Sequence, residues 1–387
     1  MKASISRRCV YRTIGDKVFI ENLDDPFSRH VLGGSATKIW TYLEQGASIE
    51  AIIKQVSEKY QAPAYQVERD VTALLCGLHK KGVILAPDLK GPTGAENRPG
   101  ESRSADHSDG PDGTTIYEQL VREIAEKKMV IKAHIEITYT CNFRCVQCYV
   151  GPLLNDKQIS RNQMTTSELT NLITQLADQG CMHLTFTGGE LFTRGDIFEV
   201  LEHANSKRFA IRLQTNGSLI TEQTAKRLQE IPTIDTIEVS FFGADRETSE
   251  QITGTKNSLE RATNALRWLK AYGLPAYLKY VLMKQNLDGF ERAKELAQEV
   301  GVRFISGMGN IYPTTTGGKK NLEYLVSEEE TLRLMVEGKL GVQQILSDCS
   351  SSSWLCKAGI VRCTITPTGE VWPCERLPFS LGNVRGA

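Results

Sequence analysis

The chain contains 387 residues, of which 40% are hydrophobic and 24% are charged, and its 46 basic residues are matched by 46 acidic ones. This composition excludes a disordered tail, a collagen and a small disulfide-stabilised scaffold, and a net charge of zero gives no long-range attraction to nucleic acid or to anionic lipid. Because the first residues lack the apolar segment of a secretory signal and no apolar run is long enough to cross a bilayer, we expect a cytoplasmic protein of two or three domains that binds neither membrane nor nucleic acid.

Residues 1–90 are predicted to form a winged-helix-like domain. β-Prone runs at Cys9–Thr13 and Lys17–Glu21 flank a Gly-Asp turn, and a third short strand is expected at residues 28–32. Winged helices often bind DNA, but 13 basic against 10 acidic residues, with no basic stripe on the recognition helix, argue against that function here. Three helical patterns follow the strands, with apolar faces at Ile39, Trp40 and Leu43, at Ile49, Ile52, Ile53, Val56 and Tyr60 after the N-cap Ser48, and at Val67, Val71, Leu74, Leu75 and Leu78 before Gly82.

Residues 91–113 have the composition of a linker. This segment contains no aromatic residue and no Val, Ile or Leu, so it cannot bury a core of its own. A flexible chain of this length spans roughly 25–30 Å between its ends. We therefore expect a flexible tether and a domain boundary here.

From residue 114 to residue 325, strand patterns alternate with helical patterns. The first strand, Ile131–Ile137, leads into a loop with three cysteines, and the second, His183–Phe186, leads into a Gly-Gly-Glu turn. Thr165 and Glu168 form a capping box that opens the helix between these strands. Six β/α repeats predict an α/β fold, a partial (β/α)6 barrel with its chemistry at the carboxyl ends of parallel strands. The remaining expected strands are Phe209–Leu213, Thr236–Ser240, Ala276–Val281 and Val302–Ile305, with helices near 196–207, 221–230, 258–271 and 288–300.

The ten cysteines are unevenly distributed. In a chain without a secretory signal, clustered cysteines are read as metal ligands or reactive thiols before disulfides. One cluster falls within eight residues and a second lies near the C-terminal end, whereas Cys9, Cys76 and Cys181 are isolated and are interpreted as small, partly buried hydrophobic residues. The clusters are Cys141, Cys145 and Cys148, and Cys349, Cys356, Cys363 and Cys374.

The first cluster has the spacing Cys-x3-Cys-x2-Cys. Three thiolates favour iron–sulfur or zinc over hard cations. Structural zinc takes four protein ligands, and no nearby His or Cys supplies the fourth, so an iron–sulfur cluster is the preferred interpretation and zinc the alternative. Three thiolates on a four-iron cluster leave one iron open to another ligand.

The segment Thr140–Tyr149, TCNFRCVQCY, resembles the signature of the radical SAM enzymes, and the resemblance extends over residues 130–310. It implies that Cys141, Cys145 and Cys148 bind a [4Fe–4S] cluster whose open iron is chelated by the amino and carboxylate groups of S-adenosylmethionine (SAM). Electron transfer then cleaves the sulfonium and releases a 5′-deoxyadenosyl radical, which takes hydrogen from the substrate.

The same resemblance assigns SAM-binding roles to six further residues. The turn Gly188-Gly189-Glu190 looks like the family's GGE motif, in which the glycines allow close approach of the backbone and Glu190 accepts from the methionyl ammonium. Asn216 and Ser240 follow the third and fourth strands and are expected near the ribose and the carboxylate, although a plain strand-end turn explains each equally well. Arg261 is a candidate partner of that carboxylate, with a solvated helix charge as the alternative.

Residues 326–387 resemble the opening half of the SPASM/twitch extension that follows many radical SAM cores. The matching words are Cys356-Lys357-Ala358-Gly359 and Thr366–Cys374, with Gly369 in an expected hairpin turn. A complete SPASM domain has further cysteines downstream, so the resemblance implies one auxiliary iron–sulfur cluster, with zinc as the alternative. Its ligands are Cys349, Cys356 and Cys374, and Cys363 either completes the set or leaves an open iron.

The N-terminal domain resembles the PqqD-like element of radical SAM maturases of ribosomally made peptides, through Val18–Leu23 and Gly46–Glu50. Such elements hold a leader peptide as an added strand at the sheet edge, beside the third helix. A tethered leader raises the effective concentration of its core peptide to around millimolar.

The predicted function is therefore a radical SAM enzyme that modifies a precursor peptide, with a crosslink as the favoured product over an epimer and with flavodoxin or ferredoxin as reductant. One alternative is a radical SAM enzyme that acts on a folded protein or a tetrapyrrole. The alternative from another class is a DNA-binding redox regulator whose cluster only senses.

Overall fold

A computed structural model describes residues 2–25, 29–89, 121, 123–306, 311–338 and 358–386. The chain divides into two compact units. The first comprises residues 1–129 with two short additions, 177–182 and 208–210, and the second comprises the remainder. The predicted linker, residues 91–113, lies outside the described residues.

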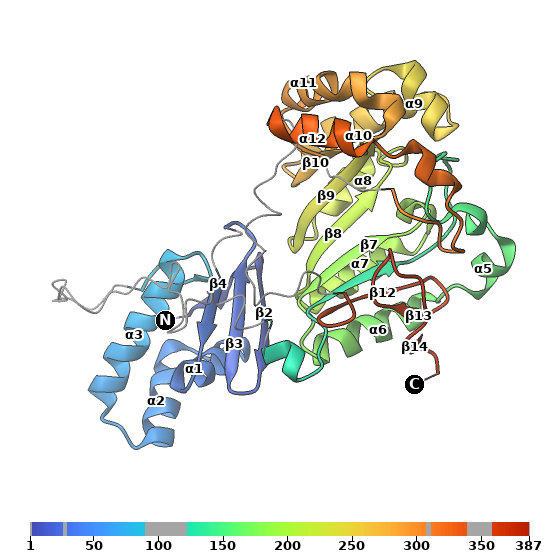
Figure 1. Cartoon of the computed structure of the whole chain (residues 1–387). Coiled ribbons are helices and arrows are strands. Elements are labelled where there is room, and N and C mark those ends of the chain that lie inside the picture. The colour runs from blue at the N-terminus through green and yellow to red at the C-terminus, as the bar shows by residue number, and fades with distance from the viewer. Residues whose placement is uncertain are drawn as a thin grey trace. The chain divides into compact units, whose positions relative to one another are not determined.

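The first unit contains two small sheets and three helices. Strands β2 (Cys9–Ile14), β3 (Lys17–Asn22) and β4 (Arg29–Leu32) form an antiparallel sheet in that order, and β1 (Ser4–Ile5) pairs with β5 (Ile84–Leu85). The helices are α1 (Ser35–Glu44), α2 (Ile49–Tyr60) and α3 (Ala64–Lys80), drawn in blue in Figure 1.

The predicted hairpin, third strand and three helices of this unit are all confirmed. The Ser48 hydroxyl accepts from the Ala51 backbone N–H at 3.2 Å and caps α2, as its position before the apolar run predicted. The apolar faces of the helices pack with Val18 and Ile20 of β3 around Trp40, which is fully buried. Burying these faces against one small sheet gives the unit its own core.

The second unit is built on one nine-stranded sheet with the order β11-β10-β9-β8-β7-β6-β12-β13-β14. The six strands β6 to β11 are neighbours in sequence order, and the pairings of β6 with β7 and of β8 with β9, β10 and β11 in succession are parallel. This confirms the predicted α/β fold with its six repeats. The strands are β6 (Lys132–Glu136), β7 (His183–Thr187), β8 (Ala210–Thr215), β9 (Ile234–Phe241), β10 (Ala276–Tyr280) and β11 (Arg303–Ser306).

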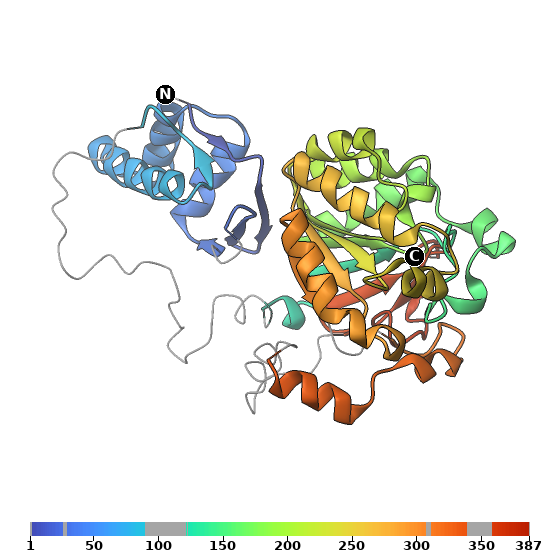
Figure 2. The ribbon, with the colours of Figure 1, turned by 90° about the horizontal axis from the view of Figure 1, so that it is seen from above.

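Helices follow the strands in chain order and cover one face of the sheet, as the green to orange ribbons of Figure 2 show. The predicted capping box is present: the Thr165 backbone N–H donates to Glu168 at 2.8 Å, and the Glu168 N–H donates to the Thr165 hydroxyl at 3.3 Å. The helices are α5 (Lys157–Asn162), α6 (Thr166–Asp178), α7 (Ile197–Ser206), α8 (Glu222–Gln229), α9 (Arg246–Thr253), α10 (Ser258–Ala271), α11 (Phe290–Val300) and α12 (Glu328–Val336), with 3₁₀ turns η1 (Gly151–Leu153), η2 (Leu191–Thr193), η3 (Lys284–Gly289) and η4 (Lys320–Tyr324).

The C-terminal segment extends the same sheet. Strand β12 (Arg362–Ile365) pairs in parallel with β6, and β13 (Glu370–Trp372) and β14 (Gly382–Asn383) follow as antiparallel strands. The expected hairpin turn is confirmed: Gly369 has φ +88° and its N–H donates to the Thr366 carbonyl at 3.0 Å. In Figure 1 these three strands are red. Strand β12 is the one that lies next to β6.

Among the residues that the structure describes, no helix is both long and apolar enough to cross a membrane.

Candidate functional site

The second unit contains a cavity of about 360 Å³. It is lined by residues of the strands of the large sheet and of the loops that follow them. Its lining brings together the three cysteines of the first cluster, both glycines of the Gly-Gly-Glu turn, Asn216 and Ser240. These residues are separated by up to one hundred positions in the sequence, and the parallel sheet gathers them because each follows or ends a strand. Glu190 and Arg261 are outside the lining.

The cysteine loop is anchored on both sides by hydrogen bonds. The Arg144 and Val146 backbone N–H groups donate to carbonyls at the end of α9, at 2.9 and 3.0 Å. The Cys141 sulfur accepts from the Phe143 N–H at 3.4 Å and from the Asn216 side-chain amide at 3.9 Å. Donors aimed at sulfur stabilise a thiolate, which is the form that binds metal.

The three thiols are partly buried in the lining of the cavity. Burial raises the pKa of Cys141 to about 11 and raises the pKa values of Cys145 and Cys148. A cation bound among the three thiols would favour their thiolate forms. In the described parts of the chain, no three His, Cys, Asp or Glu side chains already converge as a metal site. The loop offers three soft donors to one cavity, which fits an iron–sulfur cluster in ligand type and number.

The Gly-Gly turn packs directly on the backbone of the cysteine loop. The Gly189 N–H donates to the Thr138 carbonyl at 2.7 Å, and the Glu190 N–H donates to the Thr140 carbonyl at 2.9 Å. A Cβ atom on Gly188, whose φ is +138°, would lie 2.1 Å from the Thr138 oxygen, and one on Gly189 would lie 2.4 Å from the Thr140 oxygen. The structure therefore explains both glycines by the contact between the two loops.

Glu190 is fully buried and its carboxylate joins two strand ends. Its two oxygens accept from the Thr215 hydroxyl at 2.8 and 2.9 Å, from the Asn216 N–H at 2.7 Å and from the Phe192 N–H at 3.2 Å. Burial raises the pKa of Glu190, and the Asn216 and Thr215 hydrogen bonds oppose that effect. In this structure the carboxylate fixes the turn after β7 to the turn after β8.

The remaining predicted SAM contacts divide into two kinds. Asn216 is buried, and its amide donates to the Asn142 side-chain oxygen at 3.0 Å as well as to the Cys141 sulfur, so it stands directly against the cysteine loop. Ser240, near the end of β9, also lines the cavity. Arg261 is exposed on α10 and is not brought to the cavity.

Sequence reasoning missed a buried carboxylate next to the cysteine loop. Glu136, the last residue of β6, has no exposed surface and accepts from the hydroxyls of Tyr139 at 2.6 Å and of Tyr149 at 2.5 Å. Burial raises the pKa of Glu136 to about 7. The signal was available in the alternation of Lys132, His134 and Glu136 with apolar residues, which places polar side chains on the inner face of a parallel strand.

Two of the four C-terminal cysteines can be placed. Cys363 on β12 and Cys374 after β13 are both buried, and burial raises the pKa of Cys363 to about 11. The Gly359 N–H donates at 3.2 Å to the carbonyl of the residue before Cys374. Cys349 and Cys356 lie outside the described residues.

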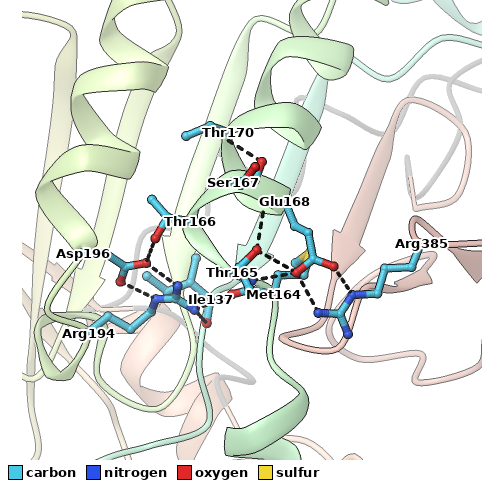
Figure 3. Close-up of polar contacts among 10 residues, drawn as sticks. All are labelled: Ile137, Met164, Thr165, Thr166, Ser167, Glu168, Thr170, Arg194, Asp196 and Arg385. Carbon is cyan, nitrogen blue, oxygen red and sulfur yellow. Dashed lines mark hydrogen bonds and ion pairs between the residues drawn. The ribbon is translucent and has the colours of Figure 1, made fainter.

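Two hydrogen-bond clusters, one around Arg194 and one around Arg385, hold loops of the second unit together (Figure 3). Arg194, only 8% exposed, donates to the Ile137 and Met164 carbonyls at 3.0 Å each and to both oxygens of Asp196 at 2.9 and 2.5 Å. Arg385 donates to both oxygens of Glu168 at 2.7 and 2.8 Å. The Arg194 cluster connects Ile137, directly after β6, to Met164, two residues before α6. The Arg385 cluster connects the C-terminal segment to the first turn of α6.

We expect Arg194→Met to lower the free energy of unfolding by about 2–4 kcal/mol, because it leaves two buried carbonyls without this donor and leaves Asp196 with the Thr166 hydroxyl as its remaining side-chain donor. Arg385→Met should cost less than about 1 kcal/mol, because that side chain is 34% exposed and its ion pair is screened by water. Chemical denaturation of the two variants measures both values. Equal losses would contradict the structural distinction between the clusters.

Comparison with known proteins identifies two domains. Residues 135–297 match the model of the radical SAM superfamily, and residues 28–84 match that of coenzyme PQQ synthesis protein D (PqqD). The radical SAM domain predicted from the cysteine loop and the PqqD-like element predicted from the N-terminal residues are therefore both confirmed. Radical SAM proteins use a [4Fe–4S] cluster and SAM.

Three similar proteins have curated descriptions. The chain is 25% identical to AdoMet-dependent heme synthase of Methanosarcina barkeri, over 65% of this chain and 78% of that protein. It is 27% identical to mycofactocin maturase MftC of Mycolicibacterium smegmatis, over 64% of each, and 27% identical to PqqA peptide cyclase of Granulibacter bethesdensis, over 62% and 66%. The chain thus matches slightly less than two thirds of the length of the maturase and of the cyclase.

Solved structures agree with the fold. SuiB of Streptococcus suis bound to its precursor peptide SuiA superimposes with a TM-score of 0.58 at 15% identity, covering 97% of this chain and 83% of SuiB. SuiB bound to S-adenosylmethionine gives the same TM-score at 16% identity, covering 96% and 82%. At this level of identity the likeness establishes the fold.

Proposed function

We propose that this radical SAM enzyme modifies a ribosomally made precursor peptide. The observation that carries the proposal is the joining, in one chain, of a PqqD domain to a cavity lined by Cys141, Cys145, Cys148 and a Gly-Gly turn. A PqqD-type domain has no role in cleaving SAM, so its presence points to a substrate that is held at a distance from the reacting atoms. One of the similar proteins, the cyclase, has a name that describes action on a peptide.

In the proposed site, Cys141, Cys145 and Cys148 hold the catalytic cluster, and Gly188, Gly189, Asn216 and Ser240 surround SAM. Bound there, the cluster and SAM supply the radical that takes hydrogen from the substrate. Glu190 orients Asn216 by accepting its backbone N–H, and Asn216 donates in turn to the Cys141 sulfur. The buried wall keeps water from the reacting groups, which protects a radical from quenching.

We assign one auxiliary iron–sulfur cluster to the C-terminal segment, with Cys349, Cys356 and Cys374 as ligands and Cys363 as the candidate fourth. The contact between Gly359, three residues after Cys356 in the sequence, and the residue before Cys374 supports the grouping of those two cysteines. Such a cluster suits an oxidative product, because an electron must leave the substrate radical. A side-chain crosslink, through thioether or carbon–carbon bonding, is the product that we favour, with flavodoxin or ferredoxin as the reductant of the catalytic cluster.

The leader of the peptide is assigned to the PqqD domain, as an added strand beside β4, which is the last strand of the described three-stranded sheet. Strand β4 pairs with β3 on one side, and His30 on β4 lies 3.5 Å from the amine of Lys81 at the end of α3. The edge therefore adjoins the third helix, which is the place where an extended peptide finds both backbone partners and a side-chain groove.

A core peptide supplied without its leader is expected to be modified about 100-fold less efficiently than the complete precursor, because tethering supplies the effective concentration. The precursor would be sought as a short reading frame with a leader-like segment beside this gene, and mass spectrometry measures its modification. Free leader added in excess should inhibit the complete precursor, whereas a scrambled leader should not. Equal turnover of precursor and core would contradict the role assigned to the PqqD domain.

The tetrapyrrole alternative has an observation in its favour, since one similar protein is a heme synthase. It predicts that the reduced enzyme modifies a tetrapyrrole, with no dependence on a leader. The PqqD match at residues 28–84 favours the peptide. The redox-regulator alternative predicts no cleavage of SAM, and that experiment opens the Discussion.

A further inference from the structure

The inner wall of the cavity, below the cysteine loop, is unusually polar for a parallel sheet. Lys132 and His134 alternate on β6 with Ala133 and Ile135, which are fully buried on the opposite face. Parallel strands covered on both faces are normally continuous apolar runs. The other strands repeat the pattern, with Arg212 on β8, Lys279 on β10 and Arg362 on β12 all in the lining.

Cations outnumber carboxylates on this wall. The lining contains Lys132, Arg212, Lys279, Arg362 and Arg376, and its one carboxylate is Glu375. Glu375 is paired with Arg362 at 2.9 Å. A second carboxylate, Glu238, is 5% exposed behind the wall and is shared by Lys279 at 2.7 Å and Arg212 at 3.5 Å. Glu136, at the end of β6, is a third carboxylate on the inner face of the sheet. Five cations therefore face three carboxylates.

The excess of positive charge is centred on Lys132. Arg362 is its direct partner in the register of β12 with β6, so their backbones lie about 5 Å apart. In the described chain Lys132 has no ion pair, and burial, followed by repulsion from Arg212 and Arg362, lowers the pKa of its amine to about 8. Two neighbouring nitrogens, Nε of Arg362 and Nε2 of His134, are buried without a hydrogen-bond partner among the described residues.

Partly buried cations that lack a matching anion are unfavourable until an anion meets them. Burial lowers the pKa of His134 to about 4, so the imidazole is neutral and can neither supply nor offset charge. Among the described side chains of the wall, cations therefore remain in excess of carboxylates. The partner that this arrangement lacks is an anion with two acceptor oxygens, small enough to enter a cavity of about 360 Å³.

We propose that Lys132, Arg212 and Arg362 form a subsite for a carboxylate group of the peptide substrate, so that the enzyme acts beside an acidic side chain or a chain-terminal carboxylate. This inference rests on the proposed function and adds the chemical character of the residue that enters the barrel. The subsite fixes how deeply that substrate residue enters the barrel. A carbon atom next to the bound carboxylate group then faces the cysteine loop.

The carboxylate of SAM is the other anion to consider. Through the family resemblance it is chelated at the iron, next to cysteines that follow the carboxyl end of β6. Lys132 and Arg362 stand at the beginning of β6 and β12. Five residues of strand separate the two ends of β6 by roughly 13 Å. The cationic wall therefore lies deeper in the barrel than the methionyl carboxylate.

The test measures acetylation of Lys132 in the full-length, anaerobically reconstituted enzyme with SAM present. An amine with a pKa of about 8 reacts readily with sulfosuccinimidyl acetate near pH 8, and a bound carboxylate covers it and raises its pKa. The probe is N-acetyl-L-glutamate α-amide, and N-acetyl-L-glutamine α-amide is its uncharged control. We expect the glutamate probe to slow acetylation of Lys132 by about 10-fold at saturation. Exposed Lys226 on α8 serves as the internal reference.

A third compound, N-acetyl-L-alanine, carries its carboxylate at the chain terminus. Protection by this compound alone assigns the subsite to a peptide end, and protection by the glutamate probe alone assigns it to an acidic side chain. Arg212→Gln should weaken the protection, whereas Arg267→Gln, on the exposed side of α10, should not.

Three results would overturn the proposal: equal protection by the glutamine control, no protection by either carboxylate, or complete protection by SAM alone. These results are distinct from failure of the proposed function, which is read from 5′-deoxyadenosine and from peptide mass in separate assays. An enzyme that cleaves SAM and modifies its peptide while Lys132 stays unprotected retains the proposed function and loses the subsite.

Discussion

Cys145→Ala is expected to abolish cleavage of SAM, with 5′-deoxyadenosine falling by more than about 100-fold in reconstituted protein reduced by dithionite. Loss of an outer partner of a metal ligand already costs 10–100-fold in activity, and Cys145 is proposed as a ligand itself. The thiols at 141 and 148 would remain, but two donors cannot hold the cluster in the cavity that they line. Liquid chromatography of the quenched reaction measures the product.

Cys76→Ala is the matched control. This cysteine lies on α3 in the first unit and does not line the cavity, so the variant should cleave SAM as the unmodified chain does. Iron content should fall in the Cys145 variant alone. If both variants make no more 5′-deoxyadenosine than protein without iron while the unmodified chain is also inactive, the sensor alternative is favoured. Zinc in the loop of oxygen-free preparations would contradict the iron–sulfur assignment.

Gly188→Ala is expected to lower the free energy of unfolding by about 2–4 kcal/mol and to remove measurable binding of SAM. An alanine at φ +138° is strained, and its Cβ would lie 2.1 Å from the Thr138 carbonyl oxygen, so the turn after β7 must move off the cysteine loop. That movement breaks the hydrogen bond from Gly189 to Thr138. Chemical denaturation and equilibrium dialysis with SAM measure the two effects.

Gly195→Ala is the control for this substitution, because a Cβ at Gly195 meets no atom within 4 Å. Its unfolding free energy should stay within about 0.5 kcal/mol of the parent value. A Gly188 variant that keeps parental stability and SAM affinity would show that the two loops are not rigidly packed.

Much of the fold could be predicted because its signals are local. Alternating strands and helices, the capping box at Thr165 and Glu168 and the turn at Gly369 each depend on a few neighbouring residues, and the structure confirms them. The position of β12 could not be predicted. It pairs with β6 across more than half of the chain, and a four-residue strand carries no information about its distant partner.

The candidate site was predicted in part for a related reason. Cysteine spacing is a sequence pattern, so Cys141, Cys145 and Cys148 could be identified before their common cavity was seen. The hydrogen-bond partners of Glu190 could not, because Thr215 and Asn216 reach it through the fold. In the sequence, the cations of the wall are only alternate residues on separate strands. The fold brings them together in one cavity lining, which could not be predicted from each strand alone.

The parallel pairing of β12 with β6 has a consequence for the nascent chain. Until the ribosome has added the segment that contains β12, β6 is an edge strand with one side unpaired. It carries Ala133 and Ile135, which are fully buried in the finished protein. At 5–20 residues per second that interval is on the order of ten to fifty seconds. Self-association during synthesis is therefore the characteristic hazard of this topology, and chaperone occupancy of β6 should be greatest in that interval.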